Sequence, residues 1–250
     1  MGVLEPPVLS ASRWKTNGAL IAAIAKVGWL HEQWTVVDPT YGEGAFWTQW
    51  KPATLLASDL NASKSPSGLS LNATKMPLDD NSVDAATIDA PYQLRGSSSS
   101  EMDERYGVEE YETVEFRHSL MKAMMKEAAR YVRPGGTILF KCQAQVCSGR
   151  YWNQPHIMVE YGESRLGLEQ VDEFLFLAHR GQPERSMCGG CGAAIMLRSS
   201  GDLKGCWATM TRSTPPTSTC PDGTPHSPTV TTQEHSHRNY SAMLVFQVTK

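Results

Sequence analysis

Short apolar runs alternate along the chain with longer segments in which apolar residues recur at helical spacing. This alternation is typical of βαβ units around a parallel sheet. Seven runs are predicted as strands, at residues 34–38, 53–59, 69–73, 84–89, 137–142, 171–178 and 241–248. Residues 16–27 and 109–132 are predicted as helices, and the second carries one apolar stripe of Phe116, Leu120, Met124, Ala128 and Tyr131. We therefore expect an α/β fold with a doubly wound sheet.

Residues 182–236 interrupt this alternation, because they are rich in Gly, Ser, Thr, Pro and Cys and lack sustained periodicity. We interpret them as an insertion that is either flexible or organised by a metal ion. The predicted organisation is a core over residues 1–181, the Cys-rich insertion over 182–236, and the last strand of the core sheet over 237–250.

Composition excludes few classes of protein. The chain has 250 residues, 40% of them hydrophobic, with a net charge of -3. No run approaches the roughly 18 to 20 apolar residues of a membrane helix, and the first residues lack the pattern of a secretion signal. We therefore expect a cytoplasmic protein without a membrane partner. Residues 179–250 carry seven basic and four acidic side chains, and this small excess of positive charge hints that the region faces phosphate groups. The oligomeric state stays open.

A glycine turn between two acidic strand ends suggests a nucleoside site. Asp38 closes the first predicted strand and leads into Gly42 and Gly44, and Asp59 closes the next strand. Glycines allow a close approach of backbone to ligand, and a carboxylate at the second strand end suits ribose hydroxyls. The third glycine of a dinucleotide fingerprint is absent, which disfavours NAD or FAD. An ordinary strand-to-helix turn is the alternative.

The ordered motifs DPTYGEG, SD, NATKMPLDDNSVD, DAPY and RPGG resemble the class I S-adenosylmethionine-dependent methyltransferases. The resemblance covers about residues 15–180 and the last strand. It implies a Rossmann-like, seven-stranded, mostly parallel sheet with an antiparallel last strand, and S-adenosylmethionine as the cofactor.

The resemblance also implies roles for single residues. Asp38 and the turn of Gly42 and Gly44 would hold the methionine part of the cofactor, and Thr40 is counted with these cofactor-binding residues. Asp59 would take the ribose hydroxyls. Asn72 stands where the family usually has an aspartate at the adenine, and Ala73 would supply a backbone N–H. The segment 14–17 would lie near the methionine end.

The tetrapeptide Asp89-Ala90-Pro91-Tyr92 follows the fourth predicted strand, at the carboxyl edge where such sheets bind ligands. It is similar to the motif of methyltransferases that act on exocyclic amino groups, although Ala90 replaces the usual first proline. Asp89 and the carbonyl of Ala90 can each accept an N–H of the acceptor amine, and this favours the transition state for transfer. Tyr92 can stack on the base. A simple strand end and turn is the alternative.

As the acceptor we expect adenine N6 in DNA rather than cytosine N4. The base would have to be flipped out of the duplex or single-stranded. Gln93, Arg95 and Lys141 are expected near this edge, although a solvated lysine is equally compatible. Alternatives are methylation of RNA, of a protein Gln or of a small molecule, and an inactive nucleic-acid-binding module. The compact size resembles phage-encoded modification enzymes.

Four of the six cysteines lie in the insertion, and they form one candidate metal site. Cys188 and Cys191 are a Cys-x2-Cys pair, and Cys206 and Cys220 follow without a second close pair. Four such ligands could hold a structural zinc ion tetrahedrally. Free thiols in a flexible loop and redox chemistry are the other interpretations.

Overall fold

The computed structural model describes residues 8–12, 14–94, 113–147, 150–177 and 240–249, together with the backbone of four short strands between residues 186 and 230. The chain divides into two compact units. The first comprises Met1–His179 with Asn239–Lys250, and the second comprises Arg180–Arg238. A seven-stranded sheet belongs to the first unit and a four-stranded sheet to the second.

The seven strands run in the order β1-β8-β13-β5-β4-β2-β3. Four neighbours are mutually parallel, namely β2 (Thr35–Asp38), β3 (Thr54–Ala57), β4 (Val83–Asp89) and β5 (Val132–Cys142). The last strand, β13 (Tyr240–Val248), lies between β5 and β8 (Leu168–Leu177) and is antiparallel to both. The predicted α/β class, the mostly parallel sheet and the antiparallel last strand are confirmed.

The bounds of β3 and β8 differ from the prediction by up to three residues, and two other strands differ more. The run at 69–73 contributes a single bridge, between Ser70 and Asp59, and the seventh strand is instead the short β1 (Ala11–Ser12) beside β8. Strand β5 begins at Val132 rather than at Thr137. Its pairing with β4 shifts register over this stretch, where Gly135 has a positive φ of 75°.

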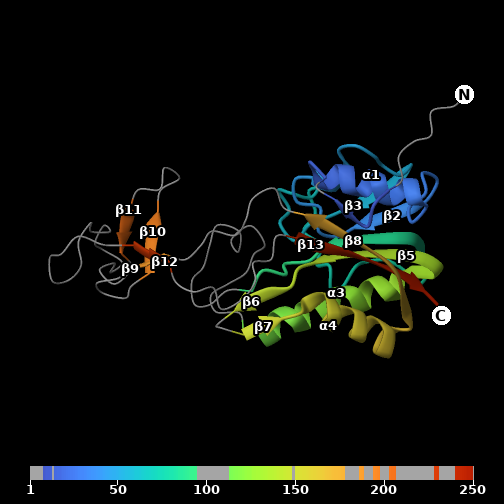
Figure 1. Ribbon diagram of the computed structural model, residues 1–250. Coiled ribbons are helices and arrows are strands. Elements are labelled where there is room, and N and C mark those ends of the chain that lie inside the picture. Colours follow the sequence, from blue (N-terminus) through green and yellow to red (C-terminus); the bar gives the residue numbers. More distant parts are fainter. Residues whose placement is uncertain are drawn as a thin grey trace, which may run out of the picture. The chain divides into compact units, whose positions relative to one another are not determined.

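Helices cover both faces of the sheet (Figure 1). On one face, α1 (Asn17–Val27) begins where the Thr16 hydroxyl accepts the Ala19 N–H, and it ends at Gly28 with a φ of 101°. The buried residues of α1 pack against side chains from β2, β5, β8 and β13. Both ends of this helix therefore follow local capping signals, and its apolar stripe provides the packing.

On the other face, α3 (Val114–Tyr131) and α4 (Gln154–Tyr161) pack over the sheet. Met124, Ala128 and Tyr131 are buried as the stripe predicts, but Phe116 is 51% exposed. Met121 supplies the buried position in the first half of the helix instead. The sequence did not predict α4, the π-helical turn η2 (Gly162–Leu166) or the antiparallel pair of β6 (Gln145–Cys147) and β7 (Arg150–Trp152).

The second unit contains an antiparallel sheet in the order β11-β10-β9-β12. Its strands are β9 (Ser186–Cys188), β10 (Ala194–Leu197), β11 (Leu203–Cys206) and β12 (Pro228–Val230). The Cys-rich segment thus contains regular backbone pairing, which its lack of periodicity did not suggest.

Candidate active site

The turn after β2 requires glycine at one of its two glycine positions for reasons of space. Gly42 and Gly44 have φ angles of 53° and 68°. A Cβ on Gly44 would lie 2.5 Å from the Tyr41 hydroxyl, whereas a Cβ on Gly42 would meet only the Thr40 carbonyl oxygen, at 4.0 Å. The turn leads into a short 3-10 helix, η1 (Ala45–Trp47), rather than a long helix. The backbone at Gly42 is therefore open to a ligand.

Asp38 is buried under this turn, with 1% of its surface exposed. One carboxylate oxygen, Oδ1, accepts the Thr40 N–H at 3.0 Å and the Thr40 hydroxyl at 3.3 Å, and Oδ2 accepts the Trp47 indole N–H at 2.7 Å. Burial raises the pKa of Asp38 to about 7, although these hydrogen bonds lower it. A second lone pair on Oδ2 can accept one more donor.

Asp59 lies beside the same turn and is 8% exposed. Its Oδ2 accepts the Gly42 N–H at 2.9 Å, and its Oδ1 accepts the Asn61 N–H at 2.8 Å. Two backbone amides thus fix the carboxylate, and each oxygen keeps a lone pair. Two adjacent acceptors with this orientation match the two hydroxyls of a vicinal diol.

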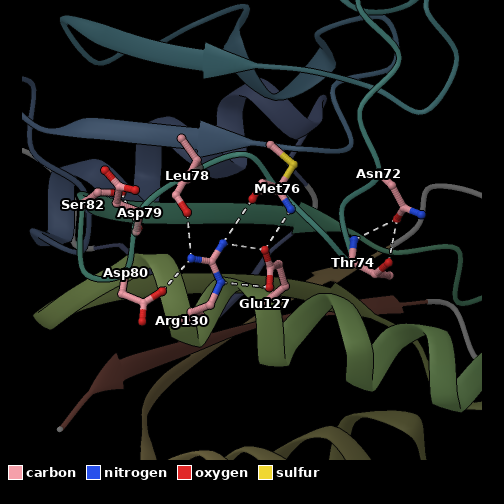
Figure 2. Close-up of polar contacts among 9 residues, drawn as sticks. All are labelled: Asn72, Thr74, Met76, Leu78, Asp79, Asp80, Ser82, Glu127 and Arg130. Carbon is pink, nitrogen blue, oxygen red and sulfur yellow. Dashed lines mark hydrogen bonds and ion pairs between the residues drawn. The ribbon is translucent and has the colours of Figure 1, made fainter.

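Asn72 and Ala73 lie in the next loop. The Asn72 side-chain oxygen accepts the N–H of Thr74 at 2.9 Å and its hydroxyl at 2.8 Å (Figure 2). The side-chain oxygen that we expected to contact an adenine ring is thus engaged in a local turn. Asn72 as a whole is exposed. Ala73 is buried, with 5% exposure, so its backbone is packed into the core side of the loop.

An arginine on α3 fixes the segment that follows this loop (Figure 2). The guanidinium of Arg130 donates to the carbonyl oxygens of Met76 at 3.1 Å and Leu78 at 2.7 Å. It also forms ion pairs of 2.7 Å with Glu127 and Asp80. Glu127 in turn accepts the Met76 N–H at 2.8 Å. Four contacts therefore anchor the segment to α3, and the Arg130–Glu127 pair links the two helix residues that make them.

The tetrapeptide lies directly beside the glycine turn. The Asp89 N–H, at the end of β4, donates to the Thr40 hydroxyl oxygen at 2.9 Å. Ala90 and Pro91 are buried, and the Tyr92 N–H donates to the Ala90 carbonyl at 2.7 Å in a tight turn. Because Thr40 also contacts Asp38, one hydroxyl joins the candidate cofactor loop to the candidate catalytic residues.

A buried lysine faces the tetrapeptide from the neighbouring strand. Lys141 is the register partner of Asp89 on β5, and its Nζ lies 3.1 Å from Asp89 Oδ2. Only 8% of the Lys141 side chain and 23% of the Asp89 side chain are exposed. The lysine that we expected near this edge is thus an ion-pair partner of Asp89.

Gln154, the first residue of α4, was not predicted as a site residue. Its side chain is fully buried, and Nε2 donates to the carbonyl oxygens of Tyr92 at 2.8 Å and Gln143 at 2.6 Å. Its Oε1 is buried without a partner within the described part of the chain. Trp47, which caps Asp38, was missed in the same way. No motif marks either residue. Trp47 contacts a side chain that only the fold brings near, and Gln154 contacts main-chain carbonyls, which leave no signal in the sequence.

A cavity of about 430 Å³ opens at the carboxyl edge of the sheet. This volume lies within the range of small-molecule sites. It is lined by residues at the ends of the neighbouring strands, at the start of β13 and around the N-terminus of α1. These residues include two lysines and no carboxylate. The lining residues are Lys15, Thr16, Asn17, Tyr92, Lys141, Gln143, Phe176, Tyr240 and Ser241. None of the predicted cofactor-binding residues lines this cavity, whereas Tyr92 of the tetrapeptide does.

The zinc interpretation stays a prediction. Cys191 and Cys220 lie outside the described residues, and only the backbone is described at Cys188 and Cys206. These two end β9 and β11, which are separated by β10. Within the described ranges, no group of three or more His, Cys, Asp or Glu side chains could hold a metal ion. The described ranges also contain no helix with the length and apolar character needed to span a membrane.

Comparisons with known proteins identify no family. No family model and no curated protein matches the sequence. Among solved structures, a candidate methyltransferase of Bacillus halodurans C-125 has 14% identity and a TM-score of 0.45, over 92% of this chain and 99% of that one.

Two further structures are similarly distant. TrmN of Thermus thermophilus has 10% identity and a TM-score of 0.43, over 92% of this chain and 48% of its own. An S-adenosylmethionine-dependent O-methyltransferase of Thermotoga maritima has 11% identity and a TM-score of 0.39, over 92% and 65%. Similarities at this level say nothing about the reaction of this chain.

Proposed function

We propose that this chain is an S-adenosylmethionine-dependent methyltransferase that acts on an exocyclic amino group, with adenine N6 in DNA as the acceptor. One observation carries the proposal. The Thr40 hydroxyl binds both Asp38 and the Asp89 N–H, at 3.3 and 2.9 Å, so a nucleoside loop and an amino-group tetrapeptide meet at neighbouring strand ends. Ligands bind at this edge in open α/β sheets.

The residues around the glycine turn fit the cofactor chemically. Asp59 offers two fixed acceptors, suited to the ribose diol, and Gly42 has no side chain to block a close approach. In its ionised form, Asp38 keeps one acceptor for the ammonium group of the methionine part. The bound cofactor would supply a methyl group on a sulfonium sulfur.

The tetrapeptide residues would hold the acceptor amine. Asp89 Oδ1 accepts one N–H, and the Ala90 carbonyl, which keeps one lone pair beside its bond to the Tyr92 N–H, accepts the other. The amine nitrogen would receive this methyl group, the sulfur would keep the electron pair of the carbon–sulfur bond, and the proton lost by the nitrogen would pass through Asp89 Oδ1 to water. Tyr92 lines the cavity and provides a face on which a flipped base stacks.

A methyl-transfer assay with a labelled cofactor tests the proposal. Purified chain is incubated with single-stranded DNA, duplex DNA, RNA and cell-extract protein, and the modified nucleosides are identified by mass spectrometry. The proposal expects N6-methyladenine in DNA from the wild type and none from Asp89→Ala. Label in RNA, in protein or in a small molecule would refute the DNA acceptor but retain the methyltransferase. No label in any acceptor would refute the enzyme.

Calorimetry separates the two halves of the site. Asp59→Ala should weaken cofactor binding by about 1–3 kcal/mol, the scale of lost hydrogen bonds to a charged group. Asp89→Ala should leave that affinity within a few-fold, because Asp89 lies on the acceptor side. If the wild type does not bind S-adenosylmethionine, the chain is an inactive module rather than an enzyme. Equal losses in both variants would contradict the assignment of roles.

A further inference from the structure

Lys141 is held in place by three groups, two from the tetrapeptide and one from η1. Its Nζ lies 3.1 Å from Asp89 Oδ2, 5.5 Å from the centre of the Phe46 ring and 5.9 Å from that of the Tyr92 ring. Phe46 belongs to η1, which follows the glycine turn, and Tyr92 belongs to the tetrapeptide. Both ring contacts lie within the range of cation–π attraction. The ammonium group is therefore confined although it lines the cavity.

Only one of the two carboxylate oxygens of Asp89 takes part in the ion pair with Lys141. Oδ2 accepts from Lys141, whereas Oδ1 has no hydrogen-bond partner among the described residues. The backbone of Asp89 is fixed separately through Thr40. A carboxylate held at its main chain and at one oxygen has lost most of its rotational freedom, so the other oxygen is presented in one direction. That oxygen is the one left for an acceptor amine.

We infer that Lys141 is a positioning residue for the proposed methyl transfer, acting by holding Asp89 so that Oδ1 alone meets the acceptor. This inference rests on the proposed function. Since the ion pair is neutral overall, Asp89 serves as an oriented hydrogen-bond acceptor rather than as a strong base. The proton released by the nitrogen after methyl transfer therefore passes from Oδ1 to water and does not accumulate on Asp89. Lys141 itself touches neither the methyl group nor the nitrogen.

Kinetics of Lys141→Met and Lys141→Arg test this role. The probe is a single-stranded oligonucleotide that contains adenine, with labelled S-adenosylmethionine. Lys141→Met keeps the length of the side chain but loses the charge, and we expect kcat to fall at least tenfold while cofactor affinity changes less than twofold. Lys141→Arg should recover part of kcat. The matched control is Lys126→Met, since Lys126 is exposed on α3 and away from the site, and its kcat should equal that of the wild type.

A double-mutant cycle with Asp89→Asn distinguishes this inference from the proposed function. If Lys141 acts through Asp89, its substitution should cost little further kcat in the Asp89→Asn background. The same cycle measured by urea unfolding reports the coupling even in a chain that transfers no methyl group. Unchanged kcat in Lys141→Met, or additive losses in the unfolding cycle, would overturn the positioning role. A wild type without transfer to any acceptor would instead refute the proposed function, and the catalytic role of Lys141 with it.

Discussion

The burial of Asp38 makes the stability of this fold depend on pH. Its carboxyl group is 1% exposed, and burial raises its pKa from 3.8 to about 7. Between these two values the folded chain keeps a proton on Asp38 that the unfolded chain releases. The contribution of Asp38 to stability is therefore complete below about pH 4 and is lost as the pH rises through about 7.

The size of the effect follows from the two pKa values. From pH 5 to pH 8, the loss amounts to about 2.5 kcal/mol in the free energy of unfolding, at about 1.4 kcal/mol for each pKa unit. This is a large share of the total stability of about 5–15 kcal/mol that is typical of a domain. It should therefore be measurable by equilibrium unfolding.

The assay is urea unfolding at pH 5, 6, 7 and 8, without cofactor, on the wild type and on Asp38→Asn. Asparagine keeps the volume but does not titrate. Its amide NH2 group must face the donors of either Thr40 or Trp47. This lowers the stability of the variant by an amount that does not change with pH. The difference between the two chains cancels all other titrating groups. We expect this difference, wild type minus variant, to fall by about 2.5 kcal/mol from pH 5 to pH 8.

Two results would refute this reasoning about Asp38. A difference that stays constant with pH would mean that the pKa of Asp38 is the same in the folded and unfolded chains. A difference that rises with pH would mean that the three hydrogen bonds to Asp38 outweigh its burial and lower its pKa.

Two further predictions concern the glycine turn and its link to β4. Gly44→Ala should cost roughly 2–4 kcal/mol of stability, from its positive φ and the contact with Tyr41, whereas Gly42→Ala should cost about 1 kcal/mol from φ alone; equal losses in urea unfolding would exclude the steric contact. Thr40→Val should lower the free energy of unfolding by about 1–3 kcal/mol, because it leaves the Asp89 N–H without an acceptor. Thr40→Ser keeps the hydroxyl and should stay within about 0.5 kcal/mol of the wild type. A valine variant as stable as the serine variant would show that this bond is not needed.

The apolar runs predicted six of the seven strands of the large sheet, including the short edge strand β3. The strands that end in Asp38 and Asp89 are central, so their continuous apolar character is visible in the sequence. The run at 69–73 has a similar composition but makes only one bridge, since pairing depends on a neighbour and not on the run itself. The helix α4 was missed because it is eight residues long and contains a proline in its first turn.

The candidate site was predicted where a residue lies at a strand end within a motif. Asp89 ends β4 and Asp59 lies just beyond the end of β3, and the structure brings each beside the glycine turn. Trp47 and Gln154 were not predicted, because each acts by a hydrogen bond to a group that only the fold brings near. The turn that occupies the oxygen of Asn72 was also invisible, since it depends on the conformation of the following two residues.

Side chains from different elements tie the ends of the central strands together. Thr40 joins the end of β2 to that of β4, Lys141 joins β5 to β4, and Gln154 holds the main chain beyond both β4 and β5. Each tie crosses between elements that are more than ten residues apart in sequence, so the site exists only in the folded sheet. Because these contacts join groups of the protein itself, the fold fixes the distance between the glycine turn and the cavity. Such preorganisation is what an in-line transfer between two bound groups requires, since a misplacement of about 1 Å is enough to slow it severely.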